Sequence, residues 1–216
     1  MYKKLILTVL ISFLVIFNSC LGLSMDIQMN KDGSGRVEME YRISHMLENL
    51  GAFDGNESMP PIPLSKEDWK KTVERSPGLK LVSHSSKNDK QDTVINIVLD
   101  FKNEEALLSF LDPIGEKVSL KRKDNSGTLE IIIIDSPLSL DEDDMGLTQL
   151  LLDGYNFSFS FRALGNSVLV ITDGSGNSIQ TPPSSASVLA GRKVSFKTEM
   201  SDIFNFDKGL GLRVIW

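Results

Sequence analysis

The alternation of apolar and polar residues dominates this chain beyond residue 20, and a period of two residues predicts β-strands. Leu23 to Met29 and Val37 to Ile43 alternate in this way, on either side of the turn sequence Asp32-Gly33-Ser34-Gly35. This arrangement predicts a β-hairpin. The same pattern predicts two further hairpins, Leu79–His84 with Thr93–Phe101 and Val118–Lys123 with Thr128–Ile134.

The last third of the chain is also rich in predicted strands. Phe157, Phe159 and Phe161 alternate with serines, and Phe196 lies in another strand-like segment. These four aromatic residues either fill the core or line a cavity for an apolar ligand. Strand spacing favours the core, because residues two apart lie on the same face of a strand.

Two segments carry clear helix signals. Ser65 and Asp68 stand at the two positions of a capping box, and Pro77-Gly78 ends the predicted helix. Asn103 is the expected N-cap of a second helix. A third helix is expected from Asp141 to Asp153, after a second capping-box match at Ser139 and Glu142.

Together these elements predict an α+β fold. We expect antiparallel β-hairpins with two or three helices packed on the sheet, and a strand-rich C-terminal part. No segment has the composition of a linker, although the acidic stretch from Asp135 to Asp144 is the best candidate for a boundary. We therefore expect a single domain spanning residues 20–216.

The first twenty residues indicate export and a membrane anchor. Lys3 and Lys4 precede an apolar run from Leu5 to Phe17, which is too short for the about 30 Å of a bilayer core. Residues 1–19 therefore predict a signal peptide. Cys20, the one cysteine of the chain, follows Phe17-Asn18-Ser19, which resembles the relaxed cleavage boxes of spirochaete lipoproteins. That resemblance implies that Cys20 is lipidated, with acyl chains (palmitate among them) as the anchor.

Two other readings of this segment stay open. Cleavage after Gly22 would satisfy the small-x-small rule of ordinary secretion, and an uncleaved anchor is the other alternative. Lipidation predicts attachment to a membrane of the cell envelope, on its periplasmic face or at the cell surface. It leaves open which of the two membranes holds the protein.

The motifs that carry catalytic or metal chemistry are missing from the sequence. His45 and His84, the only two histidines, stand in no metal-ligand or triad pattern. Three Asp-[Gly/Asn]-Ser-Gly turns, at Asp32, Asp124 and Asp173, each supply one carboxylate, whereas calcium needs several oxygen ligands. We therefore expect no catalytic residues, no metal site and no cofactor, and predict that the protein is not an enzyme.

The net charge of the chain excludes some classes of binding partner. A formal net charge of −6 argues against nucleic acid and against an anionic membrane surface, since both attract basic proteins. The negative charge itself is most simply explained as an aid to solubility. The expected partners are the membrane, through the acyl chains, and a lipid or protein of the envelope.

The start of the exported chain resembles LppM-like bacterial lipoproteins. The resemblance rests on Cys20, the strand Leu23 to Asn30, the turn Asp32 to Gly35 and the strand Val37 to Ser44. It implies an envelope lipoprotein with contact to lipid or glycolipid and no catalytic residues. The sequence therefore predicts a non-enzymatic, membrane-anchored lipoprotein that acts by binding or scaffolding. The alternative is a carrier or sensor of a lipid or other apolar ligand, held in a cavity between sheet and helices.

Overall fold

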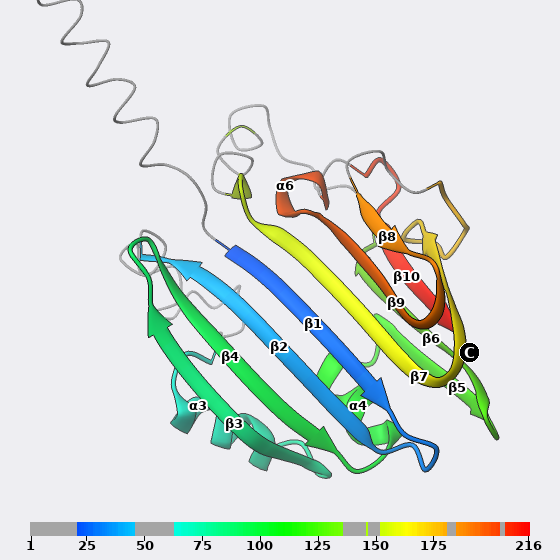
Figure 1. Cartoon of the computed structure of the whole chain (residues 1–216), viewed down its shortest axis with the longest axis horizontal. Helices are drawn as coiled ribbons and strands as arrows, with labels where there is room; N and C mark the ends of the chain where they lie inside the picture. The colour runs from blue at the N-terminus through cyan, green and yellow to red at the C-terminus, as the bar shows by residue number, and fades with distance from the viewer. Residues whose placement is uncertain (1–20, 46–62, 136–145, 147–151, 181–184, 204–205) are drawn as a thin grey trace, which may run out of the picture.

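The computed structural model describes residues 21–45, 63–135, 146, 152–180, 185–203 and 206–216 (Figure 1). In chain order the described elements are β1 (Leu21–Met29), β2 (Gly35–Ser44), α3 (Lys66–Glu74), β3 (Leu79–Asn88), β4 (Asp92–Phe101), α4 (Glu104–Leu111), β5 (Val118–Lys123), β6 (Ser126–Ile134), β7 (Asn156–Thr172), β8 (Ala186–Val188), β9 (Ala190–Glu199), α6 (Met200–Ile203) and β10 (Leu210–Ile215).

The strands form one ten-stranded sheet, and the predicted α+β fold class is wrong. Neighbouring strands follow the order β3-β4-β2-β1-β7-β10-β6-β5, with β9 paired to β7 and β8 to β9. Among the described strand pairs, β1 with β7 is the single parallel one, so the sheet is mixed. The described helices α3, α4 and α6 have only 9, 8 and 4 residues. The fold is therefore mostly β, and the helices do not form a layer across the sheet.

The three predicted hairpins are confirmed, and their register explains the core. Leu99 pairs with Val37, Val37 with Ile27, and Ile27 with Phe161. Phe161 in turn pairs with Val194, and each of these five side chains is 0% exposed. One apolar row thus runs across β4, β2, β1, β7 and β9, because alternate residues of each strand point to the same face.

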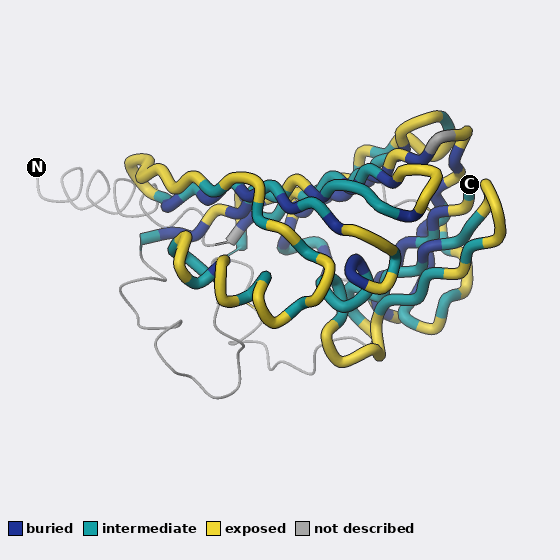
Figure 2. The backbone as a smooth tube through the Cα atoms, turned by 90° about the horizontal axis from the view of Figure 1, so that it is seen from below, coloured by how far each residue is buried: buried dark blue, intermediate teal, exposed yellow. Residues whose placement is uncertain are grey.

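The long strand β7 bends, so that the strands paired with its second half fold back over the apolar face of the sheet. Its first half pairs with β1 and β9, and its second half, from Val168 to Thr172, pairs with β10. The register against β9 shifts between Arg162 and Ser167, where a β-bulge bends the strand. Strands β10, β6 and β5 consequently lie behind β7 and β9 in Figure 1, as a second layer (Figures 1 and 2).

Contacts between the layers close the core at this end. The rings of Phe161 on β7 and Trp216 after β10 lie 5.0 Å apart between centroids. Arg122 on β5 reaches the β1–β2 turn, where its guanidinium donates to the Lys31 carbonyl at 2.6 Å, and it forms an ion pair with Glu104 of α4 at 2.9 Å. The sheet therefore covers much of its own apolar face, which is why the prediction of helices as the covering layer failed.

Helices α3 and α4 cover the remaining part of that face, beside β3, β4 and β2 (Figure 1). Both predicted N-caps are confirmed: the Ser65 side chain accepts from the Asp68 amide, and the Asn103 side chain from the Ala106 amide. Most of the third predicted helix, Asp141 to Asp153, lies outside the described residues, as do Ser139 and Glu142. Among the described helices, none is long and apolar enough to cross a membrane.

Candidate functional site

An apolar pocket of about 390 Å³ lies between the sheet and the two longer helices. Its walls come from three parts of the fold: the inner face of β1 and β2, the region of α3, and the region of α4. Met200 of α6 completes it. The lining residues are Leu23, Met39, Tyr41, Pro63, Trp69, Thr72, Ser76, Ser109, Phe110, Pro113 and Met200. The described residues do not enclose the pocket fully.

The polar atoms of the innermost wall are satisfied within the wall itself. The indole N–H of Trp69 donates to the hydroxyl of Tyr41 at 2.9 Å, and that hydroxyl donates to the carbonyl of Pro63. Tyr41 is 4% exposed and Trp69 3%, so both would be costly to leave without partners. Because the three groups bond to one another, the wall offers a ligand mainly its ring faces.

Aromatic contacts extend this wall from the sheet to α4. The ring centroids of Tyr41 and Trp69 lie 6.4 Å apart, and those of Trp69 and Phe110 lie 6.3 Å apart. Both pairs are tilted, the arrangement that aromatic rings favour over face-to-face stacking. Sheet, α3 and α4 are therefore held together by one line of rings that also forms the pocket wall.

The local sequence fixes where these rings stand. Ser65 and Asp68 form a complete capping box, with the Ser65 hydroxyl donating to the Asp68 carboxylate at 2.6 Å. This hydrogen bond is the main reason that the pKa of Asp68 lies below its usual value. The box defines the first turn of α3 and so directs Trp69, one residue later, toward Tyr41. Asn103 plays the same part for α4 and Phe110.

The described lining of the pocket is uncharged and largely apolar. Among the described lining residues there is no Asp, Glu, Lys, Arg, His or Cys. Burial raises the pKa of Tyr41 to about 12, so its phenol is neutral at physiological pH. Three hydroxyls remain, on Thr72, Ser76 and Ser109, and the Thr72 hydroxyl donates to the Asp68 carbonyl at 3.0 Å. A neutral, largely apolar ligand suits such a surface.

Most of these lining residues escaped sequence reasoning, and the aromatic residues named as cavity candidates do not line the pocket. Phe157, Phe159, Phe161 and Phe196 are between 0% and 8% exposed and belong to the filled core, as their strand spacing favoured. The signal for Leu23, Met39 and Tyr41 was the same alternation, which predicts an inward face but not whether it is packed. The missing information was how far α3 and α4 reach over that face.

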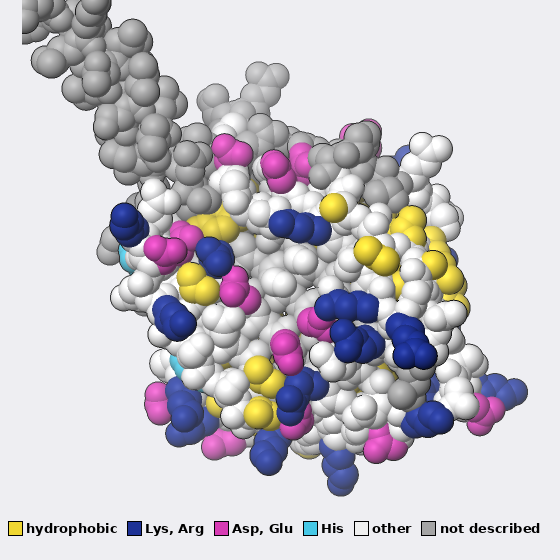
Figure 3. Space-filling model, in the orientation of Figure 1, with side chains coloured by type: hydrophobic (Ala, Val, Ile, Leu, Met, Phe, Trp, Pro, Cys, Tyr) yellow, Lys and Arg dark blue, Asp and Glu magenta, His cyan; other side chains and the backbone are white. Residues whose placement is uncertain are grey.

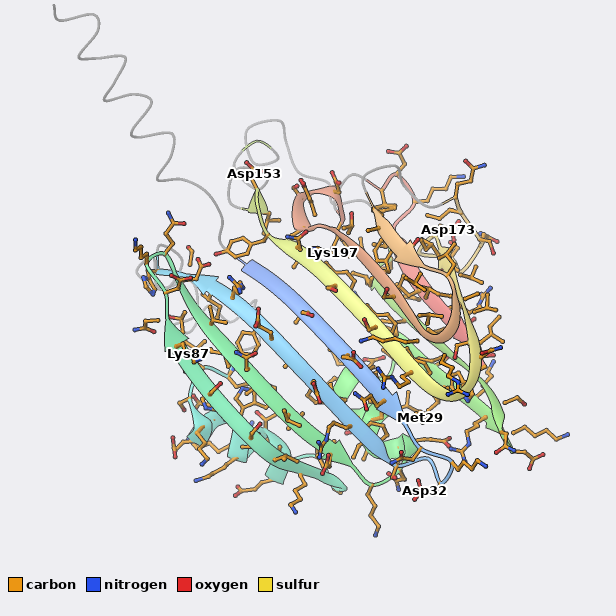
Figure 4. All side chains as sticks on the ribbon, in the orientation of Figure 1. Met29, Asp32, Lys87, Asp153, Asp173 and Lys197 are labelled. Carbon is orange, nitrogen blue, oxygen red and sulfur yellow. The ribbon has the colours of Figure 1, made fainter. Side chains whose placement is uncertain are left out.

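The three Asp-Ser-Gly turns lie apart from one another, and the carboxylates of Asp32 and Asp173 accept hydrogen bonds from within their own turns. Asp32 accepts from the Ser34 amide and hydroxyl, and Asp173 accepts from the Ser175 and Asn177 amides. The Ser34 hydroxyl is the main cause of the lowered pKa of Asp32, and the Asn177 side chain, which donates to Asp173 Oδ2 at 3.1 Å, is the main cause of the lowered pKa of Asp173. Asp124, between β5 and β6, has a φ of 55°. Figure 4 shows Asp32 and Asp173 at well-separated points of the sheet, and no cluster of three or more His, Cys, Asp or Glu side chains suited to a metal occurs among the residues described.

The other singled-out residues have structural settings or lie outside the described ranges. The Nε2 atom of His84 lies 3.2 Å from the Leu64 carbonyl, and the His45 amide donates to the Gln91 carbonyl at 2.9 Å. Neither histidine lines the pocket. Cys20 and the acidic run from Asp141 to Asp144 lie outside the part of the chain that the structure describes.

A larger hollow of about 550 Å³ lies on the outer face of the sheet, near the start of β1. Its lining mixes acidic and basic groups, and two of them, Glu40 and Arg42, form an ion pair at 3.1 Å. Another, Asp92, accepts a hydrogen bond from the Tyr155 hydroxyl at 2.5 Å. This hollow offers little apolar surface, so the smaller apolar pocket is the better candidate for a ligand site.

No family model matches this chain, and no curated protein or solved structure matches it significantly. The candidate site therefore rests on its own geometry. The resemblance of the N-terminal segment to LppM-like lipoproteins stays a prediction.

Proposed function

We propose that this protein is a non-enzymatic, membrane-anchored lipoprotein of the bacterial envelope whose domain binds a neutral apolar ligand. The anchor is the lipidated Cys20 that the leader pattern predicts. The ligand occupies the pocket between the sheet and helices α3 and α4. This proposal takes up the carrier or sensor reading of the sequence in preference to scaffolding alone.

The pocket is the single observation that carries the proposal. Its volume of about 390 Å³ falls within the about 300–1,000 Å³ typical of small-molecule sites. Leu23, Met39, Trp69 and Phe110 supply apolar surface, and Ser76 and Ser109 supply hydroxyls for a polar end of the ligand. An apolar hollow of this size favours ligand binding over scaffolding alone.

The position of the pocket in the sequence suits a ligand that comes from a bilayer. Leu23, on the pocket wall, follows Cys20 by three residues, a distance of at most about 10 Å in an extended chain. A lipidated Cys20 would hold this wall close to the membrane surface. An apolar molecule would then have a short path through water between membrane and pocket.

Fluorescence quenching tests this binding, because the chain has two tryptophans and only Trp69 lines the pocket. The probe is a dibrominated monoacylglycerol, a neutral single-chain lipid whose bromines quench indole emission on contact. In the Trp216→Phe protein, where Trp69 is the remaining emitter, we expect saturable quenching. In the Trp69→Phe protein, Trp216 reports from the other end of the core and should be quenched far less.

Ser109 provides the matched pair of variants for the same titration. Ser109→Phe places a ring in the pocket from α4 and should abolish quenching of Trp69, whereas Ser109→Ala removes only the hydroxyl and should preserve it. Equal quenching of both tryptophans, or quenching of Trp69 that survives Ser109→Phe, would contradict the proposal.

The anchor needs its own test, since Cys20 is the proposed acylation site. Cys20→Ser removes the thiol, so the protein should lose its acyl chains and leave the membrane fraction, or accumulate unprocessed. Detergent-phase partitioning and the mass of the protein measure this. A parent protein without acyl mass, together with a Cys20→Ser variant that is processed and partitions as the parent does, would favour ordinary secretion or an uncleaved anchor.

A further inference from the structure

Exposed apolar side chains gather around the second half of β7, where Val168 pairs with both β9 and β10, on a surface we term the corner patch. Its members are Val168, Val188, Leu189 and Ile215, with exposed fractions of 48%, 52%, 41% and 43%. Val168 is the register partner of Ile215, and the Leu169 amide donates to the Leu189 carbonyl at 2.7 Å. Figure 3 shows this apolar area at the right-hand side of the molecule.

Basic side chains border the corner patch on the same face (Figure 3). Arg162 and Lys193 are cross-strand partners on β7 and β9, just before the bulge of β7, and Arg192 precedes Lys193 in β9. Lys193 forms an ion pair with Asp26 of β1. Within the described residues no carboxylate lies within ion-pair distance of Arg162 or Arg192, and both are exposed. Two arginines therefore remain for an external anion.

Exposed valine, leucine and isoleucine side chains beside exposed arginines fit the boundary of an anionic bilayer. There apolar side chains enter the interface while cations meet the headgroup phosphates. A second copy of the chain is a poorer occupant, because a twofold contact would bring the same patches, and with them the same arginines, together. Like charges brought close in this way oppose association.

We propose that the corner patch docks the domain on an anionic lipid surface, as a second contact beside the N-terminal anchor. The net charge of −6 argued against binding to an anionic surface, but the net charge of the whole chain does not describe the local charge around the corner patch. Electrostatic attraction falls off within about 10 Å at 0.1 M salt, so the nearest charges decide. This contact is separate from the ligand pocket and does not depend on it.

The test places a tryptophan in the corner patch of the full chain, reconstituted in vesicles. Leu189→Trp adds an emitter to the patch, and Val82→Trp adds a control on the edge strand β3, where Val82 is 45% exposed. Emission of the parent protein is subtracted. With brominated phosphatidylcholine and phosphatidylglycerol, we expect strong quenching at position 189 and little at position 82. Omitting phosphatidylglycerol or raising the salt concentration should remove most of the quenching at position 189.

Charge variants separate docking from simple nearness to the bilayer. The double change Arg162→Gln with Arg192→Gln should remove most of the quenching at position 189, and Arg162→Lys with Arg192→Lys should keep it. Equal quenching at positions 189 and 82, absence of quenching, or indifference to the glutamine changes would each overturn the proposal. Emission changes that depend on protein concentration without bromine would instead identify a second copy as the occupant.

Discussion

Tyr41 and Trp69 show how one pair of side chains serves both the core and the pocket. Each is almost fully buried, and their hydrogen bond leaves the Trp69 indole N–H satisfied beside an apolar hollow. The contact between them could not be predicted from the sequence, because the two residues are 28 positions apart in the chain. Trp69 was recognisable only as an apolar residue of a capped helix, and Tyr41 as one inward position among several.

Removing the Tyr41 hydroxyl should therefore destabilise the domain. Tyr41→Phe leaves the buried indole N–H without its acceptor, which costs about 1–3 kcal/mol of unfolding free energy. Trp69→Phe removes the donor instead. In a double-mutant cycle measured by chemical denaturation, the combined change should cost less than the sum of the two single changes, because no donor is then left unpaired. Strict additivity would show that the two groups do not interact.

The same hydroxyl predicts a pH dependence at the alkaline end. The pKa of Tyr41 is raised by burial to about 12, against about 10 for an unfolded tyrosine. The folded state then binds its proton more tightly, so this contribution to stability is complete below about pH 10 and disappears as the pH rises through about 12. Denaturation midpoints across this range should fall less steeply in Tyr41→Phe than in the parent protein.

Helix caps and hairpin turns are the elements that local sequence determined best. The Ser65–Asp68 box and the Asn103 cap both form, and the turns at Asp32 and Asp124 join the predicted strands. These features depend on residues close together in the chain, so a short stretch contains the information for them. Strand lengths were less predictable: β3 runs to Asn88, beyond the predicted end at His84.

The cap of α3 can be tested directly. Ser65→Ala removes the acceptor of the Asp68 amide and should lower the unfolding free energy by about 1 kcal/mol. Ser86→Ala, at an exposed position of β3, is a matched control in which the same atoms are removed without a cap. An unchanged denaturation midpoint for Ser65→Ala would show that the cap contributes nothing to stability.

The Asp-Ser-Gly turns should behave as structural elements without calcium. Asp173 uses Oδ1 for the Ser175 and Asn177 amides and Oδ2 for the Asn177 side chain, so its carboxylate is already committed to the turn. Millimolar calcium added to chelated protein should leave the melting temperature unchanged, since a ligand of the native state must raise it. A calcium-dependent rise that Asp173→Ala abolishes would assign an ion to this turn.

The architecture of the whole molecule depends on pairings that no local pattern encodes. The parallel contact of β1 with β7 joins Leu23 to Phe157, and beyond the bulge after Arg162 the strand β10 takes the place of β1 beside β7. Alternation predicted that these segments are strands, but it is equally compatible with other partners and with helices as the covering layer. The pocket could not be predicted from the sequence for the same reason, because it lies where the second layer of strands ends and α3 and α4 begin.

The central proposal is that this pocket binds a neutral apolar ligand beside the predicted membrane anchor. Native mass spectrometry of the full chain, purified in mild detergent from cells that produce it, tests this binding without presupposing the ligand. We expect a copurified lipid-sized adduct on the parent protein and on Ser109→Ala, and its loss from the folded Ser109→Phe protein. An adduct of the same mass and abundance on Ser109→Phe, or its absence from all three proteins, would contradict the claim.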